Sequence, residues 1–377
     1  MGPVTALDEV LGTLELPGRK DEAWKYTRPA QLLDQSFTPA ETTRAEPEDL
    51  ERFDPDARLV WVDGALDRPA SRWPSGLVVE DLRPEEPSAV GFDALNRLYA
   101  RDAIRLVFRG SVPPLSLVHV STGGGHLAAV RREIVIEDGA RADVREHYVR
   151  RGEGAGLVTA FTDVQVGAGG GFTHVRVLDE QGDARHFGAV RATVADGGRF
   201  DCTVASLAAR VARVELQVTL ASAASTTLSG LSLIRDAHVD HHVTIDHASP
   251  RATSRQRFRA LLDGQARSVF TGRVIVRPGA AGTDAAQVHR ALVLSDEGVV
   301  NARPQLEIHA DDVKCAHGAA IGSLDEEALF YLRQRGLDPL AARALLTEAF
   351  AAEIVADVPE DLRERVVGSI RRWLEHA

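Results

Sequence analysis

The chain has 377 residues, of which 44% are hydrophobic, and a net charge of −11 at pH 7. This length and composition can bury a large core and accommodate two or three structural regions. The acidic balance, without a basic patch interleaved with aromatic residues, excludes nucleic acid as the main partner. The absence of any run of about 18 apolar residues argues against a membrane-spanning helix.

Two features of the sequence favour the cytoplasm, and a third argues against ATP hydrolysis by this chain. Met1–Leu16 lacks the basic start and apolar centre of a signal peptide. Two cysteines, Cys202 and Cys315, are too few to staple a secreted fold of this size. Cys202 shares a strand face with Phe200 and Val204, which predicts a core position. None of the three lysines follows a glycine, so the chain has no Gly-Lys-Ser/Thr phosphate loop.

Residues 1–100 are predicted to form a mixed α/β region. Val4–Leu14 and Phe92–Ala100 show apolar residues at helical spacing. Leu59–Val62, which is followed by Asp63-Gly64, predicts a short strand and a turn.

Residues 101–320 are predicted to form a β-solenoid. Short β-branched runs recur at roughly 12 to 16 residues and are separated by turns such as Asp138-Gly139 and Asp196-Gly197-Gly198. Many short strands with few helices between them exclude a doubly wound α/β fold and leave a sandwich, a barrel or a solenoid. The regular spacing and the small residues in the turns favour the solenoid, in which each coil buries its inward face on the next.

Residues 321–377 are predicted to form a helical domain. Leu324–Arg335, Pro339–Val355 and Glu360–His376 each have the length and apolar spacing of a helix. Ser323 and Glu326 fit a capping box at the start of the first helix.

The segment Asp311–Gly318 carries the first candidate site. Alternation places Val313, Cys315 and His317 on one face of an extended segment. A thiolate beside an imidazole suits iron–sulfur or zinc chemistry, and we expect the charge of Lys314 to favour the thiolate. The alternative is a buried cysteine beside a surface histidine. An iron–sulfur cluster takes four ligands, usually thiolates, so any cluster at Cys315 and His317 must be shared with a partner chain.

The run His238–His247 is the second candidate site. In a strand, His238, Asp240 and His242 share one face, and His241 and His247 share the other. A His-x-Asp-x-His face could ligate zinc or iron. On an exposed β-surface such a ladder is more often hydrogen-bonded or solvated, and the role of this run stays open.

The segment from Asp311 onward resembles the C-terminal signature of the SufB/SufD family, which belongs to the Suf iron–sulfur cluster assembly system. It reads DDVKCAHGA and is followed by LDEEALFYLRQRG. Glu22–Thr27, His238–His247 and Ser254–Ala280 are similar to further elements of the family in the expected order. Gly318 follows the histidine, as in the SufD branch, where the SufB branch reads closer to C-x-H-E-A.

The resemblance implies a right-handed parallel β-helix core flanked by helical regions. It also implies a non-enzymatic scaffold that pairs with a SufB-like subunit and binds a SufC-like ABC-type ATPase through the C-terminal helical region. Cluster assembly would then occur near Cys315 and His317, with a transient iron–sulfur cluster shared with the partner and none bound in isolation. Without its partner, the chain could form a homodimer.

Three alternatives come from other readings of the same residues. The chain could be a SufB-like cluster scaffold in its own right, or a metal-dependent enzyme that uses the histidines of residues 238–247. It could also be a β-helix enzyme acting on carbohydrate, a class that needs clustered carboxylates and a stacking groove. Against this last alternative, aromatic residues make up only 5% of the chain, and the adjacent Asp311 and Asp312 point to opposite faces of a strand.

Overall fold

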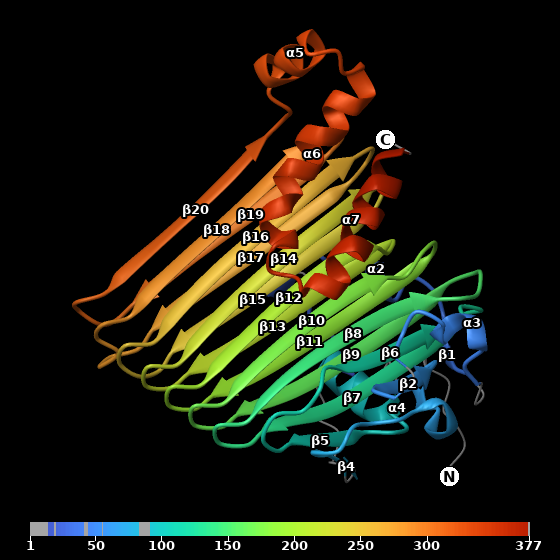
Figure 1. Ribbon diagram of the computed structural model, residues 1–377, viewed down its shortest axis with the longest axis vertical. Helices are drawn as coiled ribbons and strands as arrows, with labels where there is room; N and C mark the ends of the chain where they lie inside the picture. The colour runs from blue at the N-terminus through green and yellow to red at the C-terminus, as the bar shows by residue number, and fades with distance from the viewer. Residues whose placement is uncertain (1–13, 19, 41–43, 55, 83–90, 376–377) are drawn as a thin grey trace.

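The computed structural model describes residues 14–18, 20–40, 44–54, 56–82 and 91–375 (Figure 1). Strands make up 49% of the structure and helices 19%. The strands form a parallel β-solenoid of about 8 turns, with a mixed region at its N-terminal end and helices at its C-terminal end. The predicted fold class is therefore confirmed.

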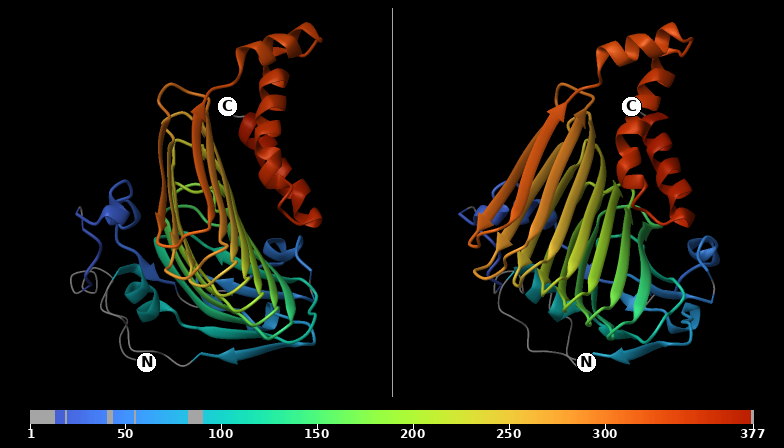
Figure 2. Two further views of the ribbon diagram at one scale, coloured as in Figure 1. Left: turned by 90° about the vertical axis from the view of Figure 1, so that its left-hand side faces the viewer. Right: turned by 60° about the vertical axis from the view of Figure 1, so that its left-hand side comes forward.

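Two sheets form the walls of the solenoid, and from β5 onward consecutive strands of the chain alternate between them (Figures 1 and 2). The sheet that we call the odd sheet contains, in spatial order, β19 (Val299–Ile308), β17 (Arg267–Val276), β15 (His238–His247), β13 (Val211–Leu220), β11 (Ala184–Val194), β9 (Gly156–Val166), β7 (His126–Ile136), β5 (Ile104–Phe108) and β4 (Leu77–Asp81), with β1 (Thr38–Pro39) beside β7. The even sheet contains β20 (Lys314–Gly322), β18 (Asp284–Val293), β16 (Thr253–Asp263), β14 (Ser225–Arg235), β12 (Arg199–Ala208), β10 (Gly171–Asp179), β8 (Arg141–Arg150), β6 (Leu115–Ser121), β2 (Arg58–Val62) and β3 (Ala65–Leu66).

The register between coils explains the spacing of the predicted strands. Leu216 pairs with Val190, 26 positions earlier, and Leu306 pairs with Val274, 32 positions earlier. Each coil contributes one strand to each sheet, so successive strands start at about half of this interval.

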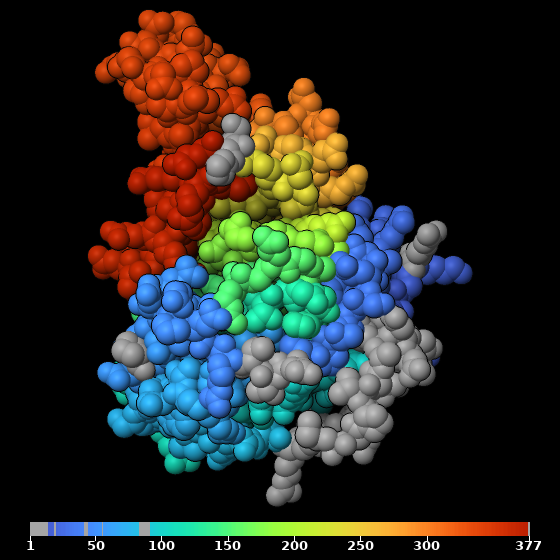
Figure 3. Space-filling model, turned by 90° about the vertical axis from the view of Figure 1, so that its right-hand side faces the viewer, coloured from blue at the N-terminus to red at the C-terminus, as the bar shows by residue number. Residues whose placement is uncertain are grey.

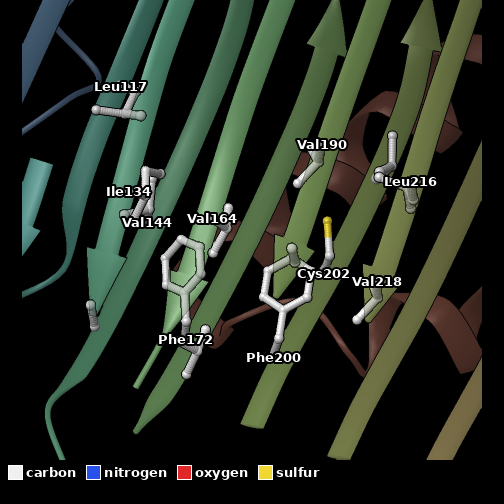
Figure 4. Packing of buried hydrophobic residues seen from close by; sticks show 14 of the residues in the cluster. Leu117, Ile134, Val144, Val164, Phe172, Val190, Phe200, Cys202, Leu216 and Val218 are labelled. Carbon is white, nitrogen blue, oxygen red and sulfur yellow. The ribbon is translucent and has the colours of Figure 1, made fainter. Parts of the chain in front are cut away.

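Side chains that face inward from the two sheets fill the solenoid (Figure 4). The rings of Phe172 and Phe200 stack with their centroids 5.6 Å apart. Cys202 lies in the same cluster and is buried, which confirms its predicted core position. Burial raises the pKa of its thiol to about 12. Because inward side chains of adjacent coils lie directly over one another, they form continuous columns along the axis.

One section of this interior is charged. Glu146 is fully buried and accepts hydrogen bonds from Arg132, Tyr148, Arg176 (2.8 Å from Nε) and His174 (2.9 Å from Nε2). Burial alone would raise the pKa of Glu146, but the charges of Arg132 and Arg176 hold it well below its usual range. The carboxylate therefore stays ionised inside the solenoid, where it neutralises part of the charge of two buried guanidinium groups.

The two ends of the solenoid differ. At the N-terminal end, β3 and β4 pair antiparallel with β2 and β5 and close the stack. At the C-terminal end, β19 and β20 have no further strand beside them among the described residues. We call this end, formed by β19 and β20, the open end.

Three helices follow β20, namely α5 (Glu326–Gln334), α6 (Pro339–Val355) and α7 (Glu360–Glu375), close to the predicted ranges. Asp325 caps α5 by accepting hydrogen bonds from the backbone N–H groups of Glu327 and Ala328. The predicted capping box at Ser323 is wrong, because the helix begins two residues later than that motif requires.

The helices α6 and α7 lie on the outward face of the even sheet, whereas α5 projects beyond the open end (Figures 2 and 3). Apolar side chains from both layers form this contact, including Val177, Leu231 and Leu261 of the sheet and Ile354 and Ile370 of the helices. The described helices include none that is long and apolar enough to cross a membrane.

The N-terminal region packs against the first coils and the odd sheet. It contains η1 (Glu22–Trp24), α2 (Pro29–Leu32), α3 (Pro47–Leu50), η2 (Arg68–Ala70) and α4 (Gly91–Tyr99). The predicted strand Leu59–Val62 falls within β2, and the predicted helix Phe92–Ala100 corresponds to α4. The predicted helix Val4–Leu14 lies almost entirely outside the described residues.

We predict that Glu146→Gln lowers the free energy of unfolding by about 3 kcal/mol or more, because it leaves Arg132 and Arg176 buried without their counter-ion. The folded-state pKa of Glu146 lies below its usual value of 4.5. The stabilisation is therefore complete above about pH 4.5 and is lost as the pH falls through the lower, folded-state pKa.

Denaturant unfolding of both proteins at pH 7 measures this difference. The matched control is Glu137→Gln, which breaks the exposed ion pair with Arg109 and should change stability by less than about 0.5 kcal/mol. Equal midpoints for the two variants would show that the interior network does not stabilise the fold.

Candidate functional site

Cys315 and His317 lie on the last strand of the solenoid, β20, and face inward. In the ladder between β18 and β20, Cys315 pairs with Ala285 and His317 pairs with Gln287. Ala285 and Gln287 are both buried inside the preceding coil. The two candidate residues therefore continue two interior columns, at Cα positions about 7 Å apart along one strand face.

The open end leaves these two side chains differently exposed. Cys315 is partly buried and packs against a small apolar cluster that includes Val274 and Val276. His317 is exposed, since no coil lies above it in the part of the chain that the structure describes. A thiol and an imidazole therefore lie together at the open end of the solenoid, where a molecule bound to that end could contact them.

The expected activation of Cys315 by Lys314 is wrong. Burial raises the pKa of the Cys315 thiol, a backbone hydrogen bond from Ala285 opposes this, and the charge of Asp284 raises it further. Lys314 is adjacent in sequence, so its side chain points to the opposite face of the strand. At rest Cys315 is a thiol, and a cation or metal ion brought by a partner would have to favour its thiolate.

Polar residues that the sequence reasoning missed form the floor beneath the site. Gln256, Gln287 and His289 face inward from β16 and β18, and each is buried. Their signal was present in the sequence, because Gln287 and His289 alternate with apolar residues in Asp284–Val293. Without knowledge of the fold, this alternation of polar and apolar residues indicates a strand whose polar face is exposed to solvent.

The run His238–His247 forms β15, and its side chains divide between two environments, as alternation indicated. On the outward face, Thr27 of the N-terminal region donates a hydrogen bond to Asp240 (2.6 Å) and accepts one from His238 (2.7 Å). Arg213 also donates to Asp240 and lies 4.0 Å from the ring centroid of Trp24. The outward face is therefore a docking surface for the N-terminal segment.

On the inward face, His241 and His247 are buried, and burial lowers the pKa of each to about 4. His247 Nε2 lies 2.9 Å from Ser254 Oγ, and His241 packs against the ring of Phe258. The expectation that this run lies on an exposed surface is wrong, although its expected hydrogen bonding is present. Among the described residues, no group of three or more His, Cys, Asp or Glu side chains is arranged to hold a metal ion.

Apolar side chains at the start of the helical region are exposed to solvent. They lie on α5 and on the first turns of α6, and they are Phe330, Tyr331, Leu340 and Leu345. Leu340 also lines a groove of about 490 Å³, together with Leu294, Ala344 and Leu374, among others. Neighbouring exposed apolar side chains of this kind mark interaction surfaces.

These features define a β-solenoid with one closed end, one open end that carries a thiol and an imidazole, and a helical arm formed by α5 and the first turns of α6. Residues 119–350 match the family described as SUF system FeS cluster assembly, SufBD core domain. This match covers more than half of the chain, so the chain belongs to the SufBD family.

Individual relatives agree with this assignment. The iron–sulfur cluster assembly protein SufD of Escherichia coli is 29% identical over 95% of this chain and 89% of its own length. A SufBD family protein of Synechocystis is 28% identical over 93% of this chain and 86% of its own length. A SufBD family protein of Mycobacterium bovis is 31% identical over 70% of this chain and 68% of its own length.

The two cysteines should differ sharply in reactivity. We predict that iodoacetamide labels Cys315 in the native protein and reaches Cys202 only after unfolding, because Cys202 is enclosed in the core. Since the pKa of Cys315 is raised from 9.0, its labelling rate should still increase above pH 9. Mass spectrometry of the labelled protein measures both rates. A rate for Cys315 that levels off below pH 8 would instead indicate an activated thiolate.

Proposed function

We propose that this chain is a non-enzymatic scaffold subunit that pairs with a SufB-like chain through its open end. The observation that carries this proposal is the last strand of the solenoid, β20, which presents Cys315 and His317 inward at an edge that no further described strand covers. Exposed strand edges offer rows of N–H and C=O groups that another strand can pair with. In this family, the natural partner for a free coil is the coil of a related solenoid.

The composition of the site supports a shared rather than a private cluster. Cys315 offers one thiolate and His317 one imidazole, whereas iron–sulfur clusters take four ligands. Cys202 cannot contribute, because it is buried in the core on β12, four coils below β20. A cluster assembled at this end is therefore cargo held jointly with the partner, and the chain alone binds none.

Apolar exposure at the open end also supports pairing. Val299 and Ile308 of β19 and Ile321 of β20 are exposed to solvent. An additional coil stacked on this end would bury them and satisfy the edge strands at the same time. Two alternatives compete with a SufB-like partner at this end. The chain could form a homodimer, or it could be a SufB-like scaffold in its own right. Both alternatives place a solenoid of the same family on the same edge.

We further propose that a SufC-like ATPase docks on the helical arm, in keeping with a cytoplasmic Suf complex. The exposed apolar side chains of α5 and α6 and the adjoining groove support this placement. The chain has no phosphate loop of its own, so the energy of ATP would reach it through such a partner. Three residues separate β20 from α5, so an ATPase bound to the arm would lie next to the open end.

We predict that Phe330→Ser combined with Leu340→Ser weakens ATPase binding by about 10-fold or more, because apolar anchors dominate such interfaces. Both side chains are exposed, Leu340 by 74%, so the fold should not change. Deletion of residues 339–377 is a poorer test, since it uncovers the apolar face of the even sheet.

Titration calorimetry with the purified ATPase measures this affinity. Leu98→Ser is the matched control, because Leu98 is 49% exposed on α4 at the other end of the solenoid. Unchanged affinity in the double variant, or an equal loss in Leu98→Ser, would remove the arm from the docking site.

We predict that His317→Ala leaves the fold and the partner complex intact but lowers the cluster content of the complex about 10-fold, because a ligand or proton carrier is lost. The measurement is iron and acid-labile sulfide in the co-expressed complex, with the melting temperature recorded in parallel. Cys202→Ala serves as the control and should act only through stability, by opening a small void in the core. Normal cluster content in His317→Ala would leave this chain a purely architectural subunit.

A further inference from the structure

The position directly beneath His317 is occupied by a buried amide. Gln287 pairs with His317 in the parallel ladder between β18 and β20, and both side chains face inward. Paired residues in adjacent parallel strands lie about 4.8 Å apart, so their side chains stack in one column. Gln287 is 1% exposed, whereas His317 above it is open to solvent.

The amide of Gln287 is anchored from below and has a free acceptor. Its Nε2 donates a 2.7 Å hydrogen bond to Oε1 of Gln256, which lies one coil lower in the same column. Its Oε1 is buried and has no hydrogen-bond partner among the described residues. A buried carbonyl oxygen without a donor costs free energy, so a donor that comes within reach is favoured.

The opposite sheet makes room for this amide. Gly272 of β17 faces Gln287 across the interior, and a Cβ atom built there would lie 1.8 Å from Gln287 Nε2. Any side chain larger than hydrogen at this position would displace the amide. The geometry thus holds Gln287 between Gly272 and Gln256 and leaves its Oε1 without a donor, while Nε2 of Gln256 below it is also unpaired among the described residues.

The other buried polar side chain of β18 is not placed in the same way. His289 is also 1% exposed and has an unpaired Nδ1. However, it stacks on Phe270 with the ring centroids 4.7 Å apart, and its ladder partner is Ala319, which offers no polar side chain. Below Cys315 the column begins with Ala285. Among the described residues, Gln287 is therefore the polar side chain that lies directly beneath His317.

We propose that Gln287 is a positioning residue for His317. Rotation of the exposed His317 side chain brings one ring N–H to Gln287 Oε1, and the hydrogen bond that then forms fixes the tautomer and the ring orientation. The second ring nitrogen then carries its lone pair toward the open end, as a ligand or base there requires. This inference deepens the proposed function and rests on it for the use of His317, although the hydrogen bond itself can be observed without any cluster.

The test uses the full chain labelled with ¹⁵N-histidine and the variants Gln287→Met and Gln256→Met. An exposed imidazole N–H exchanges with water too fast to be seen, whereas a hydrogen-bonded one gives a ¹H–¹⁵N signal. We expect a ring N–H signal that is absent from His317→Ala, which assigns it to His317. It should disappear in Gln287→Met and persist in Gln256→Met.

The two methionine variants are matched, because both glutamines are equally buried and bonded to each other. Each variant therefore disturbs the floor to a similar extent, and only one removes the acceptor. Absence of the signal from the wild-type chain, or its loss in both variants or in neither, would overturn the proposal.

Cluster content of the co-expressed complex provides the second readout. Gln287→Met should lower it about 10-fold, as loss of a hydrogen bond to a ligand commonly does, and Gln256→Met should lower it much less. Wild-type cluster content in His317→Ala would refute the use of His317 in cluster assembly, while the N–H signal would still decide the role of Gln287. A normal cluster content in Gln287→Met alone would refute the positioning role.

Discussion

Parallel, in-register stacking of coils is the constraint on which the rest of this structure depends. Each coil presents its inward side chains to the columns of the coils before and after it, so a residue must fit its neighbours 26 to 32 positions away. Gly230 illustrates this, because a Cβ atom there would meet the ring of Phe258, its partner in the ladder 28 positions later. Gly188 must also fit the opposite sheet, because a Cβ atom there would lie about 3 Å from the guanidinium group of Arg176. The interior is therefore matched coil by coil along its length.

A stack of coils has two ends, and in this structure the two ends differ in how their strands are covered. Antiparallel strands close the N-terminal end, while the last coil keeps its edges and its inward face unpaired. The outward faces are not free, because the N-terminal segment covers part of the odd sheet and α6 and α7 cover part of the even sheet. Ion pairs such as Arg257 with Asp357 (2.7 Å) fix the helices to the coils near the open end. The chemistry that the chain offers to a partner is concentrated where the repeat stops.

Much of the fold could be predicted from the sequence, because β-branched alternation and regular turns are local signals. The strands at residues 284–293 and 299–308 were not predicted, since Gln287, His289 and other polar residues interrupt the apolar pattern. The surroundings of His238 and Asp240 depend on Thr27, more than 200 positions away, and no local pattern reveals such a contact. By contrast, the error over Lys314 was avoidable, because alternation already places its charge on the face opposite Cys315.

Hydrogen–deuterium exchange of the amides in β19 and β20 tests most directly whether the partner binds at the open end. The isolated chain should exchange rapidly over residues 299–322, since these edge strands lack an outer neighbour. In the complex with a SufB-like partner, the same amides should become strongly protected, while those of β10 and β11 in the middle of the stack stay unchanged. Equal exchange at β19 and β20 in the free and assembled states would contradict the account, because the partner would then bind elsewhere.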